Sequence, residues 1–437
     1  MAQRPNILYL HSHDTGRYVQ PYGYAVPTPN IQRLAEQGVL FRECFCGGPT
    51  CSPSRAALLT GQSAHSSGMI GLAHRGFRLN DYRQHIVHTL RRAGYASALI
   101  GMQHVIPDSE SDRIGYDQVV PLKNRWSRTE IADAAGEFFR RPPSQPFFLS
   151  VGFTETHREY PEPGPAEDAR WCRPPAPVPD VPETRRDMAA FKASAFRLDE
   201  GMGRVLAALD EHGLAGDTLV ICTTDHGIAF PGMKCNLTDH GIGVMLIMRG
   251  PGGFTGGKVC DALVSQVDIF PTICELLDIG EPDWLEGYSI LPAIEDGGEI
   301  RGEVFAEVTY HAAYEPMRCV QTKRWKYIRR YGDRGRPVLP NCDDSPSKDV
   351  WLAHGWRDRP VPKEELYDLV FDPNEAQNLA ADDSKADVLD DMRERLQEWM
   401  EATDDPILKG LPVPAPQGAV VNDPDGLSPS EEPLPVR

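Results

Sequence analysis

The sequence predicts an α/β fold, in which a large and mostly parallel sheet is sandwiched by helices and a smaller C-terminal α+β subdomain is built on an antiparallel sheet. Two observations support this prediction. Across the first 300 residues, short apolar runs alternate with helical patterns, which is typical of a parallel sheet covered on both faces. After residue 300, apolar and polar residues alternate in short runs that are separated by turn signals, which is typical of an antiparallel sheet.

Five apolar runs are interpreted as buried strands of the large sheet. They are Ile7–Leu10, Ala96–Ile100, Phe147–Phe153, Leu219–Cys222 and Val244–Met248. Ligands of open α/β sheets bind at the carboxyl ends of the strands. We therefore expect the residues that follow each run to carry the chemistry.

Helix signals lie between these runs. Thr28 and Pro29 are typical of a helix start, and Gly38 is typical of its end. Ser127 with Glu130 forms a capping-box pattern before an amphipathic segment. A long helix is predicted from the apolar 3–4 spacing that begins near Phe191 and stops at Gly213.

We expect three parts: a main domain over residues 1–300, a subdomain over 301–410 and a tail over 411–437. The subdomain ends in a helix predicted over about Lys385–Met400. The tail contains seven prolines and no periodicity, so we expect it to be poorly structured. The Pro-rich segment 161–182 is predicted to form an ordered loop over the site.

The composition excludes several classes of function. The 437 residues include 45 Lys and Arg against 63 Asp and Glu, so the formal net charge is −18 and binding to nucleic acid or to a membrane surface is not expected. No apolar stretch reaches the roughly 18 residues of a transmembrane helix. The apolar run at Ile7–Leu10 is too short for a signal-peptide core, so we expect a cytoplasmic, bacterial protein with free thiols.

A carboxylate and an imidazole follow two of the predicted strands. His13 and Asp14 come just after the first strand, and Asp225 and His226 come just after the strand at Leu219. All four are standard ligands of a divalent cation. The alternative is a pair of hydrogen-bonded turns without a metal. Because both pairs stand at matching topological positions, we favour the metal site.

The run Cys51-Ser52-Pro53-Ser54-Arg55 stands at the start of a predicted helix. Free backbone N–H groups and the helix dipole favour negative charge there, and Arg55 adds a cation in the first turn. Cys51 is therefore a candidate nucleophile. A low-pKa thiol and a buried structural cysteine are the alternatives.

Together these motifs resemble the type I sulfatase family of the alkaline-phosphatase-like superfamily. The likeness covers about residues 5–400 and rests on Pro5–Leu8, Cys51–Arg55, Leu58–Gly61, Asp225–Gly227, Glu365–Leu369 and Asp372–Leu379. Finer features resemble the sulfamidase, or heparan N-sulfatase, branch. These are Ser67–Leu72, Gly227–Pro231 and Tyr314–Arg318.

The resemblance implies that a maturase oxidises Cys51 to formylglycine, whose hydrated form attacks the sulfur of a small sulfated substrate. It implies one divalent metal, calcium by family likeness, held by His13, Asp14, Asp225 and His226 with Cys51 as a further ligand. The remaining roles follow the family's motifs: Arg55 steadies the formylglycine, His104 assists it, His157 protonates the leaving group and Lys234 holds the sulfate.

Each of these last residues has a structural alternative. His104 and His157 are compatible with hydrogen-bonded core histidines, and Lys234 with a solvated loop lysine. His65 is interpreted as structural. By resemblance alone, three further residues are expected to line the pocket from the C-terminal side: Tyr310, His311 and Arg318.

Two positions depart from the family pattern. Met102 stands where the family has a lysine, which removes a cation from the sulfate pocket. His13 stands where the family has an aspartate, which shifts the metal preference toward manganese or zinc. A phosphonate monoester or phosphodiester hydrolase using the same formylglycine is the runner-up, and a non-catalytic metal-binding paralogue is the third interpretation. The sequence leaves a homo-oligomer open.

Overall fold

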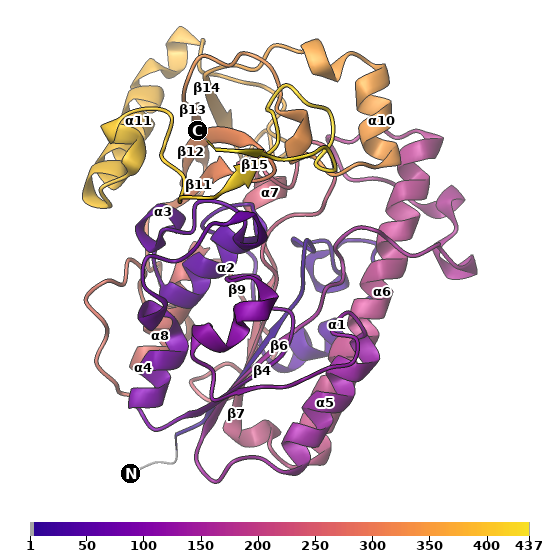
Figure 1. Cartoon of the computed structure of the whole chain (residues 1–437), viewed down its shortest axis with the longest axis vertical. Helices are drawn as coiled ribbons and strands as arrows, with labels where there is room; N and C mark the ends of the chain where they lie inside the picture. Colours follow the sequence, from indigo (N-terminus) through magenta and orange to yellow (C-terminus); the bar gives the residue numbers. More distant parts are fainter. Residues whose placement is uncertain (1–3, 437) are drawn as a thin grey trace.

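An eight-stranded sheet forms the centre of the protein in the computed structural model, which describes residues 4–436 (Figure 1). The strand order is β5-β4-β6-β1-β7-β8-β2-β9. The strands are β1 (Asn6–His11), β2 (Val39–Phe41), β4 (Ala96–Gly101), β5 (Gln118–Val119), β6 (Phe147–Gly152), β7 (Thr218–Thr223), β8 (Leu246–Arg249) and β9 (Lys258–Cys260). β3 (Cys44–Phe45) pairs separately with β10 (Val264–Ser265).

The sheet is mostly parallel, as the sequence predicts. β1 pairs in parallel with both β6 and β7, and β4 pairs in parallel with β6. The exception is β8, which runs antiparallel to β7 and β2. The carboxyl ends of β4, β6, β1 and β7 therefore lie next to one another at one edge of the sheet.

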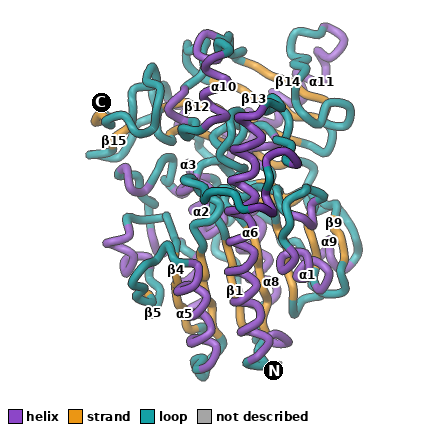
Figure 2. Tube along the Cα trace, turned by 90° about the vertical axis from the view of Figure 1, so that its right-hand side faces the viewer, coloured by secondary structure: helices purple, strands orange, loops and turns teal. Residues whose placement is uncertain are grey.

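Helices cover both faces of the sheet because its strands are apolar on both sides. Along β1, Ile7 and Tyr9 belong to one apolar cluster, and Leu8 and Leu10 belong to the other. Helices α2, α4 and α8 pack into the first cluster, and α1, α5 and α6 into the second (Figures 1 and 2). Their bounds are α1 (Pro29–Gln37), α2 (Cys51–Thr60), α4 (Ile86–Arg92), α5 (Arg128–Arg140), α6 (Pro182–Glu211) and α8 (Ile269–Leu276). Short helices connect these layers: α3 (Ala64–Ser67), α7 (Asp239–Ile242) and α9 (Leu291–Glu295).

The helix starts follow the sequence signals in most respects. Pro29 is the first residue of α1, and Gly38 follows its last. The Ser127 hydroxyl accepts a hydrogen bond from the Glu130 amide, so Ser127 caps α5. The reciprocal half of the capping box is absent, since the Glu130 carboxylate instead accepts from the amide of Asn124.

A second, antiparallel sheet lies C-terminal to the first, with the strand order β11-β12-β13-β14. Its strands are β11 (Val304–Tyr310), β12 (Tyr314–Gln321), β13 (Trp325–Arg330) and β14 (Glu364–Asp368). It packs against α11 (Ala386–Ala402), and α10 (Pro346–Ala353) packs against α6. The predicted C-terminal helix is thus present. The subdomain lies over the edge of the main sheet where β1 and β7 end (Figure 1).

Two expectations about loops were wrong. The tail is ordered within the described residues: β15 (Val420–Val421) pairs with β16 (Leu434–Pro435), and Val413, Ala419 and Asn422 are buried. The segment 161–182 is ordered, as expected, but its expected place over the site was wrong: it contributes only Pro161 to the cavity, and its middle packs around Cys172 and Val178 in a small apolar cluster.

No helix among residues 4–436 combines the length and apolar character needed to cross a bilayer.

A buried network of charges links the antiparallel sheet to helix α3 of the main domain. The Arg318 guanidinium donates to both carboxylate oxygens of Asp405, at 2.6 and 3.0 Å, and lies 3.2 Å from Glu307 Oε2. Glu307 in turn accepts from both the backbone and the Nδ1 atom of His65. The expectation that Arg318 lines the substrate pocket was therefore wrong, because the carboxylates of its own subdomain hold it. His65 is structural, as expected.

Arg318→Met should destabilise the protein strongly. The substitution leaves Asp405 and Glu307 buried without their cation, and breaking a buried ion pair in this way typically costs about 3–5 kcal/mol. The measurement is the shift in thermal or denaturant midpoint. The matched control is Arg324→Met, since Arg324 is half exposed and pairs with Asp368 at the surface, where such pairs contribute about 0–1 kcal/mol. Equal midpoints for the two variants would contradict the assignment.

Candidate active site

Four adjacent strands deliver the candidate residues to one place. His104 follows β4, His157 follows β6, and the pairs at His13 and Asp225 follow β1 and β7. The ring centroid of His13 lies 4.6 Å from that of His157 and 5.7 Å from that of His104. Asp14 and His104 both have left-handed backbone, with φ of 54° and 68°. Non-glycine residues held in this region are concentrated at functional sites.

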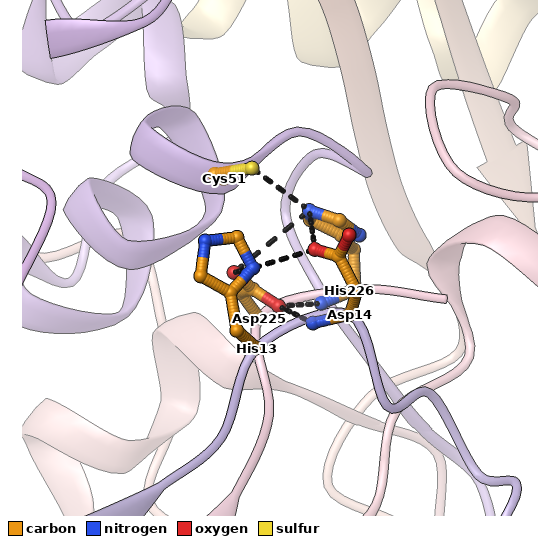
Figure 3. Close-up of side chains that lie close together, drawn as sticks. All are labelled: His13, Asp14, Cys51, Asp225 and His226. Atoms are coloured by element: carbon orange, nitrogen blue, oxygen red, sulfur yellow. Dashed lines mark hydrogen bonds and ion pairs between the residues drawn. The ribbon is translucent and has the colours of Figure 1, made fainter. Parts of the chain in front are cut away.

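Five residues form a compact group of metal-ligand type (Figure 3). One ligand atom from each lies within 4.8 Å of all the others, and all five side chains are buried. They are His13, Asp14, Cys51, Asp225 and His226, the same five that the sequence predicts. The structure therefore brings together the two strand-end pairs and the signature cysteine.

The donor set fits a divalent cation. His226 Nδ1 lies 3.0 Å from the Gly227 carbonyl oxygen, so Nδ1 carries the hydrogen and Nε2 presents a lone pair. That Nε2 atom lies 3.3 Å from Asp14 Oδ1 and 3.8 Å from Asp225 Oδ2. Three electron-pair donors thus converge without a hydrogen between them, and a bound cation removes that repulsion.

His13 completes this arrangement. Its Nδ1 atom lies 2.6 Å from Asp14 Oδ1 and 3.2 Å from Asp225 Oδ2. Burial lowers the pKa of His13 to about 4, although the two carboxylates act to raise it. The imidazole is therefore neutral at neutral pH, which is the form that binds metals.

Lys234 is a buried cation rather than a solvated loop lysine. Its Nζ atom lies 2.8 Å from Asp14 Oδ2 and 3.0 Å from Asp343 Oδ2. Burial by itself would lower the pKa of Lys234, but Asp14 and Asp343 outweigh it and raise that pKa well above its usual range. Burial would likewise raise the pKa of Asp343, yet Lys234 and His157 hold it at about 2. The ammonium group therefore stays charged.

Arg55 contacts Asp225 directly, and through it the metal-ligand group. Its Nη2 atom donates to Asp225 Oδ2 at 2.9 Å and to the Ser12 carbonyl at 2.8 Å, and its Nη1 atom lies 2.7 Å from His11 Nδ1. Burial opposes the charge on Arg55, but Asp225 raises the pKa of the guanidinium above its usual value. In the structure, Arg55 therefore orients the carboxylate of Asp225, one of the predicted metal ligands.

Cys51 is the first residue of α2, where backbone N–H groups are free. The two serines of its motif anchor the helix: the Ser54 hydroxyl donates to the Asp225 carbonyl at 2.6 Å, and the Ser52 hydroxyl accepts from the Ala73 amide at 3.0 Å. Burial raises the pKa of the Cys51 thiol well above its usual value, with Lys234 opposing the shift. The helix start is therefore fixed against both the metal-ligand group and the loop at Ala73.

A cavity of about 780 Å³ opens beside these residues. His13, His104 and His157 line it, together with Met102. Trp126 also lines the cavity with 55% of its surface exposed, and the Arg125 guanidinium lies 4.3 Å from its ring centroid. A cavity of this size is typical of small-molecule binding sites.

Some residues with expected roles lie elsewhere. Tyr310 does not line the cavity, because its hydroxyl donates to the Val413 carbonyl and its ring packs on Phe77. His311 is buried outside the cavity lining, and its Nδ1 atom has no hydrogen-bond partner among the described residues. Arg158, by contrast, lines the cavity, and its guanidinium donates to both carboxylate oxygens of Asp187 at 2.7 and 2.8 Å.

Sequence reasoning missed three residues of the site. Asp343 pairs with Lys234, His74 contacts His104, and Trp126 lines the cavity. Asp343 and His74 lie on loops with no periodic pattern. Trp126 stands just before the Ser127 cap, in the connection between two predicted strands. A large aromatic residue in such a connection was a sequence signal for a residue that lines the site.

The family comparisons agree with this geometry. The sequence model described as Sulfatase matches residues 5–279, and one described as "N-sulphoglucosamine sulphohydrolase, C-terminal" matches residues 233–349. Human N-sulphoglucosamine sulphohydrolase is 30% identical to this chain, over 99% of the chain and 95% of the human protein.

Solved structures share the fold. One, a complex with its substrate D-glucosamine-2-N,6-O-disulfate, has a TM-score of 0.74 and 19% identity over 98% of this chain and all of the other. A phosphonate monoester hydrolase of Agrobacterium radiobacter is less similar in structure, with a TM-score of 0.68 and 22% identity over 92% of this chain and 96% of the other. From the family match and the human relative together, the chain belongs to the sulfatase family, the sulfuric ester hydrolases of the alkaline-phosphatase-like superfamily.

Proposed function

We propose that this protein is a sulfamidase-type sulfatase that removes the N-linked sulfate of an amino sugar, with Cys51 converted to formylglycine by a maturase. The observation that carries the proposal is the position of Cys51. Its Sγ atom lies 3.4 Å from His226 Nε2, inside the buried group of metal-ligand type. The full-length likeness to human N-sulphoglucosamine sulphohydrolase supports the sulfamidase specificity.

The metal site in this proposal consists of His13, Asp14, Asp225 and His226 around the modified Cys51. A divalent cation held there would lower the pKa of the nucleophilic hydroxyl and draw charge from the sulfate. The carboxylates of Asp14 and Asp225, which are buried, and of Asp343, which is partly exposed, form ion pairs with two permanent cations among the described residues, Arg55 and Lys234. The residual negative charge favours a bound cation.

The residues around the metal site bind the anion and move the protons. Lys234, buried and charged beside Asp14, supplies the positive charge for the sulfate. His157 Nδ1 donates to the Arg158 carbonyl, so Nε2 is the atom at which His157 would hold a proton for the leaving amine. His104, which lines the cavity, would take the proton of the formylglycine hydroxyl.

The reaction is tested with matured enzyme and three substrate types: N-sulfoglucosamine, an aryl sulfate and an aryl phosphonate monoester. We expect the highest kcat/KM for the sulfamate. Peptide mass spectrometry should show the thiol-to-aldehyde mass change at Cys51, and Cys51→Ala should remove turnover of all three. Full activity in protein that carries only unmodified Cys51 would contradict the proposal. The highest kcat/KM for the phosphonate would favour the related hydrolase instead.

Metal preference is tested by chelation and reconstitution. We expect a chelator to inactivate the enzyme and manganese to restore at least as much activity as calcium, because two imidazoles are poor partners for a hard cation. His13→Asp should move the manganese-to-calcium activity ratio toward calcium by about 10-fold. Metal content measured by elemental analysis gives a readout independent of turnover. Rescue of the wild-type enzyme by calcium alone would show that His13 is not a ligand.

Met102 tests how the anion is held. Its side chain lines the cavity and is 7% exposed, so a lysine there would face a water-poor space beside the substrate anion. Met102→Lys should raise kcat/KM for simple aryl sulfates by roughly 10- to 150-fold, which corresponds to the about 1.5–3 kcal/mol of a charge-assisted contact. Met102→Leu is the control for volume. A loss on sulfates together with a gain on phosphonates would favour the phosphonate monoester hydrolase.

A further inference from the structure

His74 lies against His104 at the cavity. Its Nδ1 atom is 3.1 Å from His104 Nε2, and the two rings stack with an interplanar angle of 8° and centroids 5.4 Å apart. Both side chains line the cavity. This contact has no counterpart among the family motifs that the sequence carries, since His74 follows the Ser67–Leu72 segment without belonging to it.

Three hydrogen bonds hold the segment that carries His74. It is a 3₁₀ turn over Ala73–Arg75. The Ala73 amide donates to the hydroxyl of Ser52, the residue next to Cys51. On the other side Arg75 donates to the carbonyls of Ala312, in the C-terminal subdomain, and of Pro429, in the tail. The position of His74 is therefore coupled to the helix that carries the nucleophile.

A hydrogen bond between two imidazoles restricts both rings. One nitrogen must donate and the other must accept, so the bond at His104 Nε2 decides which atom of that ring carries the hydrogen. The other nitrogen, His104 Nδ1, is buried and has no hydrogen-bond partner among the described residues. If His104 donates from Nε2 to His74, its Nδ1 atom presents a lone pair.

We propose that His74 is a positioning residue: it accepts the hydrogen bond of His104 Nε2 and thereby holds the ring and its tautomer with Nδ1 as the free base. This inference rests on the proposed function, in which His104 takes a proton from the nucleophile. A base oriented by a third group is the general arrangement of activated nucleophiles. Here a neutral imidazole takes the place that a carboxylate has in a serine triad, and its own Nε2–H remains free to bond to water.

The kinetic test compares two substitutions on the best sulfated substrate. His74→Ala should lower kcat by about 10- to 100-fold with little change in KM, the usual effect of removing an orienting partner. His74→Asn should recover most of the loss, because the asparagine amide oxygen occupies nearly the place of Nδ1 and accepts the same hydrogen bond. The control His212→Ala changes an exposed histidine at the C-terminal end of α6, just before β7, and should leave kcat unchanged.

A second measurement does not depend on turnover. In protein labelled with ¹⁵N-histidine, the signals of His104, assigned by loss in His104→Gln, should show hydrogen on Nε2 in the wild type. They should show a mixture of tautomers in His74→Ala. An Nδ1–H tautomer in the wild type would overturn the inference, as would an unchanged kcat in His74→Ala or no recovery in His74→Asn. If no sulfated substrate is turned over, the proposed function fails while the tautomer measurement still tests His74.

Discussion

The burial of Asp14 and Asp225 side by side is the constraint on which the rest of the site depends. Isolated carboxylates are too costly to bury, so each has to be paired with a cation. Arg55 pairs with Asp225 from the nucleophile helix, and Lys234 pairs with Asp14 from the loop after β7. Satisfying the two charges therefore fixes the helix and the loop against the ends of β1 and β7. The same ion pairs that offset the cost of burying Asp14 and Asp225 therefore also position the side chains of the site.

The C-terminal subdomain takes part in this pairing. Asp343 follows the antiparallel strands β11–β13 in the sequence, and its carboxylate pairs with Lys234, which also pairs with Asp14. The tail adds a second connection, because the Pro429 carbonyl holds Arg75 beside His74. Residues from three separate parts of the chain thus converge around one cavity. The loop that follows the small sheet is therefore part of the active site's framework, because Asp343 pairs with Lys234.

Five histidines lie at this site. His13, His74, His104 and His157 all line the cavity, and His226 lies in the metal-ligand group. A neutral imidazole can be buried without burying a charge, and it has one nitrogen that donates and one that accepts. The hydrogen bond made by one nitrogen decides which role the other nitrogen takes. The partners of those second nitrogens are Gly227 for His226 and Arg158 for His157. Backbone carbonyls thus orient two of the rings, and His74 is the side chain that contacts a third.

The sequence alone determined the large sheet, most of its strands and the five residues of the metal-ligand group, because each signal is local. An apolar run followed by polar residues marks a strand end, and Cys51 stands in a contiguous motif. Only the tertiary structure assigned partners across long separations. Asp343 meets Lys234 109 residues away, and His74 meets His104 across two structural elements. Arg318, expected in the pocket, pairs with Asp405 instead. Such pairings depend on which partners the fold brings next to each buried charge, and a local sequence pattern does not predict them.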